Sequence, residues 1–174
     1  IIGVGIVPNV ELASGADLPC ADGITVDEFC QTADPNVLAV GDCTNHPNQL
    51  LGRNLRLESV HNAIEQGKTA AATLCGQPAA YAQVPWFWSD QYDIKLQISG
   101  LSQGYDQVVL RGDPAARSFA AFYLQGDRLL AVDAVNSPRE FMLGKKLIAA
   151  GAKLDCDALR DMAQDFKTLA TAAL

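Results

Sequence analysis

The chain has 174 residues, 49% of them hydrophobic, which is enough to bury a sizeable core in one domain, or in one small domain plus part of another. Its 20 acidic and 13 basic residues give a formal net charge of −7, which disfavours binding to nucleic acid or to an anionic membrane surface. No apolar run approaches the ~18 residues of a membrane span and no basic leader precedes an apolar core, so nothing indicates membrane insertion or secretion.

The first predicted strand covers Ile1 to Ile6. Gly3 and Gly5 within it superficially match the start of a Gly-x-Gly-x-x-Gly dinucleotide fingerprint, but Pro8 occupies the position of the third glycine. Proline lacks a backbone N–H and fixes φ, so it prevents the phosphate-binding loop that opens a helix. The sequence therefore contains no dinucleotide fingerprint.

Two further strands are predicted at Gly23 to Val26 and at Val37 to Val40, the second of them after the turn sequence Asp34-Pro35-Asn36. The continuous apolar run of the second is typical of a strand covered on both faces of a parallel sheet. Gly41 and Asp42 follow directly, at the strand end where open α/β sheets bind ligands. A carboxylate accepts hydrogen bonds, so it suits a sugar or polyol hydroxyl, although an aspartate that caps the next turn is an alternative.

A long helix is predicted to start at Glu58-Ser59-Val60 and to end before Gly76 and Pro78. Its apolar or small residues recur at the spacing of a single helix face, which predicts that this face is buried. The residues of that face are Val60, Ala63, Ile64, Gly67, Ala70, Ala71 and Leu74.

The pattern after Pro78 changes to the alternation of half-exposed strands, which favours an antiparallel sheet. Strands are predicted at Ile94 to Ile98 and at Val108 to Leu110, and a hairpin joins Phe119 to Leu124 with Leu129 to Val135.

Ser137-Pro138-Arg139-Glu140 has the pattern of a capping box, which opens a helix that continues to about Ala150 and stops at Gly151. Asp155 or Asp157 is expected to cap one more short helix, ending near Ala163.

The five cysteines are odd in number and form no C-x-x-C pair, which indicates neither a disulfide framework nor a zinc site and fits reduced thiols in a cytoplasm. Cys43, beside Asp42, is interpreted as a packing residue. Neither His46 nor His61 has another possible metal ligand near it at the spacing typical of metal sites. Surface or capping roles are therefore expected for both, and no metal site is predicted.

The segment from Thr32 to Asp42 is similar to the second FAD-binding motif of flavoproteins with two dinucleotide-binding folds. Five more segments carry a resemblance, and they are Arg56-Leu57-Glu58-Ser59-Val60-His61-Asn62-Ala63, Trp86-Phe87-Trp88-Ser89-Asp90-Gln91-Tyr92, Gly104-Tyr105-Asp106, Phe122-Tyr123-Leu124 and Ala131-Val132-Asp133-Ala134-Val135-Asn136. In this order, and along essentially the whole chain, the segments resemble the NADH-dependent ferredoxin reductases of the putidaredoxin and rhodocoxin reductase type.

This resemblance implies an α/β fragment of an FAD-binding dinucleotide fold at residues 1–78, with the exit from the NAD-binding domain at its start. An α+β C-terminal domain with an antiparallel sheet would follow at residues 79–174. The whole enzyme would transfer electrons from NADH through FAD to a [2Fe–2S] ferredoxin that serves a cytochrome P450 or a ring-hydroxylating dioxygenase. Because the dinucleotide fingerprint is absent, the fragment alone is not expected to be catalytic.

The resemblance also assigns residues to the FAD site. Asp42, next to Gly41, would hold the ribityl chain, and the N–H of Val60 would point at the edge of the flavin ring. Glu58, Ser59 and Trp88 would line the pocket, with Trp88 shielding the isoalloxazine, whereas Trp86 and Phe87 are interpreted as core residues.

Arg53, Arg56 and Lys68 form a basic group near the long helix that starts at Glu58-Ser59-Val60. Part of a ferredoxin-docking face and an ordinary solvated helix flank are equally consistent with this group. Two other functions stay open for the chain: a related NADH oxidase or apoptosis-inducing-factor-like flavoprotein with another acceptor, and a non-catalytic interaction or dimerisation module.

Overall fold

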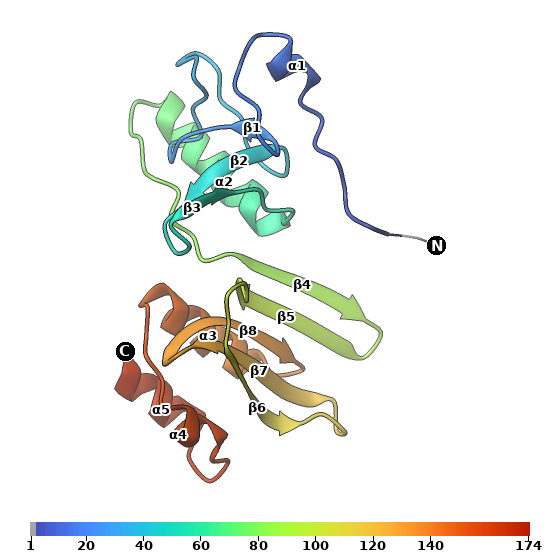
Figure 1. Ribbon diagram of the computed structural model, residues 1–174, viewed down its shortest axis with the longest axis vertical. Helices are drawn as coiled ribbons and strands as arrows, with labels where there is room; N and C mark the ends of the chain where they lie inside the picture. The colour runs from blue at the N-terminus through green and yellow to red at the C-terminus, as the bar shows by residue number, and fades with distance from the viewer. Residues whose placement is uncertain (1–2) are drawn as a thin grey trace. The chain divides into compact units, whose positions relative to one another are not determined.

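The computed structural model describes residues 3–174 and divides the chain into two compact units. Unit 1 ends at Gln83 and unit 2 is Val84–Leu174 (Figure 1). Each unit has its own secondary structure and is described by itself. The assignment of residues 1–78 and 79–174 to two kinds of domain stays a prediction.

Unit 1 contains a small three-stranded sheet and one long helix, α2. The central strand β2 pairs in parallel with β1 and antiparallel with β3. The elements of this unit are α1 (Glu11–Ser14), β1 (Ile24–Thr25), β2 (Thr44–Asn48), β3 (Arg53–Leu55) and α2 (Val60–Leu74).

Two strands predicted in unit 1 are absent from the described residues. Residues 3–6 of the predicted first strand are extended without pairing, and the first two residues of that prediction lie outside the described part. Within the segment 37–40, only Leu38 forms a bridge, with Gln31, and Val37 and Val40 are each 38% exposed. A run of four apolar residues is long enough for a strand, but pairing depends on a distant partner that the run does not specify. Strands β2 and β3 were not predicted.

Helix α2 has the predicted length, but the prediction of its buried face was wrong. Val60, Ile64 and Leu74 are 57%, 52% and 74% exposed, and only Ala70 of the predicted face is buried. The buried side is mostly polar and consists of Asn62, Gln66 and Thr69 together with Ala70. Such burial is tolerated where the polar atoms find hydrogen-bond partners.

Unit 2 contains a five-stranded antiparallel sheet with the strand order β4-β5-β8-β7-β6, which confirms the predicted α+β class. The predicted hairpin forms through β7 and β8, which pair directly across the turn at Gly126 and Asp127. The strands are β4 (Trp86–Gln91), β5 (Ile94–Gly100), β6 (Gln107–Asp113), β7 (Ser118–Gln125) and β8 (Arg128–Val135).

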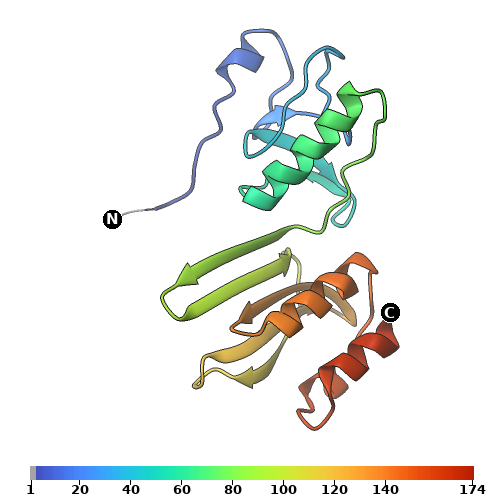
Figure 2. The same cartoon turned by 180° about the vertical axis from the view of Figure 1, so that it is seen from behind.

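Three helices cover one face of this sheet: α3 (Pro138–Ala149), α4 (Cys156–Arg160) and α5 (Phe166–Ala173) (Figure 2). Helix α3 packs on β8 and β5, and a Cβ atom at Gly144 would lie 2.6 Å from Val132 Cγ2. Phe166 of α5 packs its ring against Phe122 of β7 at 4.9 Å between centroids. The core of unit 2 therefore lies between this sheet face and the helices.

The C-terminal helices agree only in part with the sequence. Helix α3 begins at Pro138, but the capping box does not form, because the Ser137 hydroxyl donates to the Val135 carbonyl instead of capping the helix. Asp155 caps α4 as predicted and accepts from the amides of Asp157 and Ala158. Helix α5 was not predicted. None of the helices described between residues 3 and 174 combines the length and the apolarity needed to cross a membrane.

Candidate functional site

The Gly41–Asp42 turn is held by buried polar side chains of unit 1. Gly41 has a φ of +83°, a left-handed backbone conformation that glycine adopts without strain. Its N–H donates to Gln66 Oε1 at 2.6 Å, and its carbonyl accepts from the Thr44 hydroxyl at 2.8 Å and from the Thr44 amide at 3.0 Å. Asp42 is exposed. The turn therefore presents a carboxylate on a fixed backbone.

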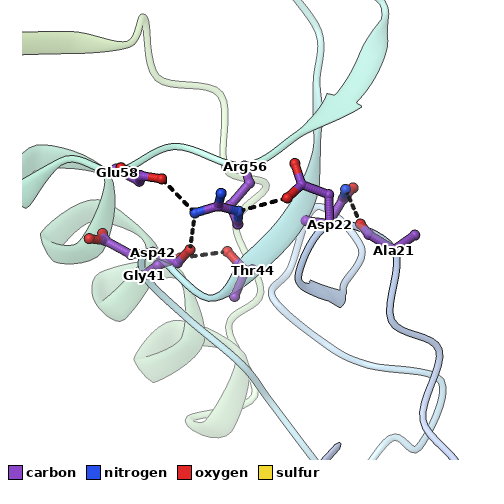
Figure 3. Close-up of polar contacts among 8 residues, drawn as sticks. Ala21, Asp22, Gly41, Asp42, Thr44, Arg56 and Glu58 are labelled. Atoms are coloured by element: carbon purple, nitrogen blue, oxygen red, sulfur yellow. Dashed lines mark hydrogen bonds and ion pairs between the residues drawn. The ribbon is translucent and has the colours of Figure 1, made fainter. Parts of the chain in front are cut away.

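Arg56 contacts this turn and connects it to Asp22 and to Glu58 (Figure 3). Its guanidinium pairs with Asp22 at 3.1 Å and with Glu58 at 2.8 Å, and it also donates to the Asp42 backbone carbonyl at 3.4 Å. A Cβ atom at Gly23 would lie 3.1 Å from Arg56 Cδ, so this glycine lets the Asp22 loop approach the arginine. The Arg56 side chain is only 11% exposed.

The start of α2 has the geometry of a capped helix. The Ser59 hydroxyl accepts from the Asn62 amide at 3.4 Å, so Ser59 is the N-cap. Val60 is the first helical residue, and its amide is one of those that have no partner within a helix. Such amides and the positive end of the helix dipole favour a negatively charged group.

The predicted basic group is accompanied by acidic partners. Arg56 carries two carboxylate neighbours, and Lys68 pairs with Glu65 at 2.6 Å. Arg56 is thus paired with carboxylates and largely buried, and its docking role stays a prediction. The Lys68 side chain is 67% exposed and Arg53 is also exposed, and the docking role of these two residues stays a prediction.

A polar cluster beneath α2 includes residues whose burial the sequence did not reveal. His46, expected at the surface, is buried in β2 with its ring edge-on to Tyr81 at 5.1 Å, and burial lowers its pKa. The Tyr81 hydroxyl donates to Asn62 Oδ1 at 2.8 Å. Burial raises the pKa of the Cys30 thiol to about 11, which keeps it protonated. Gln66, the residue that holds Gly41, was missed, although the spacing of Asn62, Gln66 and Thr69 was a polar signal for this face.

Trp88 lies in unit 2, on strand β4, and its side chain is 45% exposed. The centroid of its ring lies 5.2 Å from that of Trp86. The Trp86 ring centroid in turn lies 5.5 Å from that of Phe141 and 5.5 Å from Lys145 Nζ. An open cavity of about 470 Å³ borders the two tryptophans, and its other lining residues are Asp90, Lys95, Gln97 and Pro138. The convergence of Trp88 with Asp42 on one cofactor stays a prediction.

Comparison with protein families assigns a class to each part of the chain. Residues 1–67 match the family described as pyridine nucleotide-disulphide oxidoreductase, and residues 86–170 match the family described as reductase C-terminal. The first match covers the Gly41–Asp42 turn and the start of α2, and the second covers the five-stranded sheet and its helices. The chain therefore joins a part of the first family to the C-terminal domain that defines the second.

Individual relatives narrow this class. The chain is 47% identical to putidaredoxin reductase of Pseudomonas putida over 173 residues, which are 99% of this chain and 41% of that protein. It is 47% identical to the ferredoxin–NAD(+) reductase component of the anthranilate 1,2-dioxygenase system of Burkholderia cepacia, over 97% of this chain and 42% of that protein. The chain belongs to the ferredoxin reductase family of the putidaredoxin and rhodocoxin reductase type, and corresponds to a C-terminal portion of its members.

Solved structures agree with this assignment. The covalent complex of putidaredoxin reductase with putidaredoxin contains a chain that matches with a TM-score of 0.92 and 47% identity, over 98% of this chain and 41% of that one. The ferredoxin reductase of the CYP199A2 system from Rhodopseudomonas palustris matches with a TM-score of 0.91 and 42% identity, over 99% of this chain and 42% of that one. The chain thus spans about two fifths of the length of these relatives.

Proposed function

We propose that the chain is part of an oxidoreductase that transfers electrons from NADH through FAD to a [2Fe–2S] ferredoxin serving an oxygenase. The observation that carries this proposal is the exposed Asp42 carboxylate on a turn fixed at Gly41, within a chain 47% identical to putidaredoxin reductase. The name of the relative from the anthranilate 1,2-dioxygenase system and the complex with putidaredoxin support the ferredoxin and the oxygenase in particular.

The residues of unit 1 fit the sugar-like part of FAD. The Asp42 carboxylate accepts hydrogen bonds and donates none, so it would accept a hydrogen bond from a ribityl hydroxyl. Gly41 has no side chain, which leaves room next to the Asp42 carboxylate. Bound FAD would supply the chemistry, because it accepts a hydride and releases single electrons. The chain's own residues would bind and orient it.

The start of α2 would tune the flavin. The Val60 amide would face the ring edge that carries negative charge after reduction, and Glu58 and Ser59 would border the pocket. A helix end contributes about 0.3–1 kcal/mol at exposed sites and up to ~2 kcal/mol in partly buried ones. Since about 1.4 kcal/mol corresponds to roughly 30 mV for a two-electron couple, the shift in flavin potential would be some tens of millivolts.

The FAD assignment is tested by Asp42→Ala in the full-length protein. Loss of the acceptor should weaken FAD retention, measured as the flavin-to-protein ratio after purification and as the dissociation constant of FAD for the apoprotein. Glu11→Ala is the matched control, because it removes an exposed carboxylate from α1, away from the turn. Equal flavin content in the two variants would contradict the role of Asp42.

The electron acceptor requires a separate measurement. NADH oxidation by the full-length protein should depend on added [2Fe–2S] ferredoxin, whereas an oxidase would consume oxygen without it. If Arg53 and Lys68 contribute to docking, the rate of ferredoxin reduction should fall steeply with salt. A salt-independent rate would remove the docking role.

The five free cysteines support a cytoplasmic location for the protein.

A further inference from the structure

Gln66 is a fully buried amide, with 0% of its surface exposed, on the side of α2 that faces the Gly41–Asp42 turn. Its Oε1 accepts from the Gly41 amide at 2.6 Å, and it lies 3.0 Å from the Thr44 hydroxyl, whose one hydrogen is shared with the Gly41 carbonyl. Gly41 and Thr44 lie on opposite sides of Asp42 in the sequence. One side-chain oxygen thus fixes the backbone before the carboxylate and contacts a side chain after it.

The hydrogen bond between Gly41 and Gln66 joins residues that are 25 positions apart. The turn is therefore held by a side chain of α2 and not only by its own residues. Gly41 is buried, and its N–H would be left without an acceptor if the Gln66 oxygen were removed. A buried donor without a partner is costly, so the turn would shift to find another acceptor. Any such shift moves Asp42, the next residue.

The other atom of the amide gives independent support. Gln66 Nε2 is buried and has no hydrogen-bond partner among residues 3–174. A glutamine that served packing alone would be disfavoured by this orphan donor, since an apolar side chain of similar length would avoid the cost. The acceptor function toward Gly41 accounts for an amide at this position.

We infer that Gln66 is a positioning residue, which acts on the cofactor through the Gly41–Asp42 turn and not by touching the cofactor. This inference rests on the proposed role of Asp42 in FAD binding. It adds a residue on α2 to a site whose other members lie in the turn and at the helix start.

A double-mutant cycle tests the inference in the full-length protein, with Gln66→Met, Asp42→Ala and the double variant. Gln66→Met keeps the side-chain length and removes the acceptor. The dissociation constant of FAD for the apoprotein should rise about three- to tenfold in Gln66→Met, and should not rise further when Gln66→Met is added to Asp42→Ala. Gln66→Glu retains an acceptor and should restore binding in part.

Tyr81→Phe is the control for general destabilisation, because it removes a buried hydrogen bond to Asn62 and leaves the turn untouched. Its FAD affinity should equal that of the parent protein. Amide hydrogen exchange at Gly41 should accelerate in Gln66→Met and not in Tyr81→Phe. If Gln66→Met does not fold, Gln66→Leu takes its place in the cycle, since it also removes the acceptor of the Gly41 N–H.

The outcomes separate the two hypotheses. An equal rise in the dissociation constant with and without Asp42→Ala would make Gln66 merely structural and would overturn the inference. An unchanged constant in Gln66→Met would overturn it as well. If Asp42→Ala itself leaves the constant unchanged, the proposed FAD site fails first, and the inference fails with it.

Discussion

Arg111 should be the strongest single anchor of the C-terminal helices in unit 2. It lies on β6 with 6% of its surface exposed. Its guanidinium donates to the carbonyls of Leu159 at 2.5 Å, Asp161 at 3.2 Å and Gln164 at 2.7 Å, and lies 5.8 Å from the ring centroid of Phe166. Arg111→Met would remove all of these contacts and leave three carbonyl groups without their donor.

The size of the effect follows from these contacts. A hydrogen bond to a charged group contributes about 1.5–3 kcal/mol, and a cation–π contact about 0.5–1 kcal/mol. The desolvation of the buried guanidinium offsets part of the sum, so we expect Arg111→Met to lower the free energy of unfolding by about 3 kcal/mol. For a unit of this size, the melting temperature should fall by roughly 12–24 °C.

Urea unfolding followed by tryptophan fluorescence isolates this effect, because Trp86 and Trp88 are the only tryptophans in the sequence and both lie in unit 2. Arg160→Met is the matched control: its guanidinium pairs with Asp157 one turn away and is 51% exposed, so the cost should stay within about 0.5 kcal/mol. Equal unfolding midpoints for the two variants would refute the anchoring role of Arg111.

Two further predictions concern the same unit. Gly144→Ala gains helix propensity of about 1 kcal/mol but places a methyl group against Val132, at a cost of about 1–3 kcal/mol, so urea unfolding should show a net destabilisation. In the double variant with Val132→Ala the loss should be smaller than the sum of the single losses, and additive losses would disprove the clash. Burial raises the pKa of Asp133, whose carboxylate accepts from the Tyr123 hydroxyl at 2.8 Å. The folded state therefore holds the Asp133 proton more tightly than the unfolded state, and the parent protein gains stability as pH falls from the folded pKa toward 3.8. Asp133→Asn lacks this gain, so its stability relative to the parent should be greatest at neutral pH and should decline through that window, and a pH-independent difference would contradict the assignment.

The antiparallel sheet could be predicted because its signals are local. Phe119 to Leu124 and Leu129 to Val135 flank the short turn at Gly126 and Asp127, and the hairpin that they predict is β7 and β8. The signals that predict α3 are also local, since Pro138 begins the helix and Gly151, with a φ of +61°, follows its end. Helix α5 was missed, although Asp165 caps it by accepting from the Thr168 amide.

The sequence pointed to Asp42 by a local pattern, a carboxylate directly after a glycine, and Asp42 is exposed in the structure. Its role in FAD binding stays a prediction, and the residues that support the turn were not predicted. The polar burial of α2 depends on contacts between distant residues, such as Gln66 with Gly41 and Tyr81 with Asn62. Apolar periodicity places the most hydrophobic face inward, and here hydrogen bonds to other parts of the chain outweigh it.

The strand order of unit 2 also has a consequence for the order in which the sheet folds. The pairs β4–β5, β6–β7 and β7–β8 join neighbours in the sequence, so each closes a short loop. The pairing of β5 with β8 joins Leu96 to Val135 and is the one long-range ladder described in this sheet. Contacts between distant residues form slowly, so a β4–β5 hairpin and a β6–β7–β8 meander should appear first, and their joining at β5–β8 should limit the folding rate.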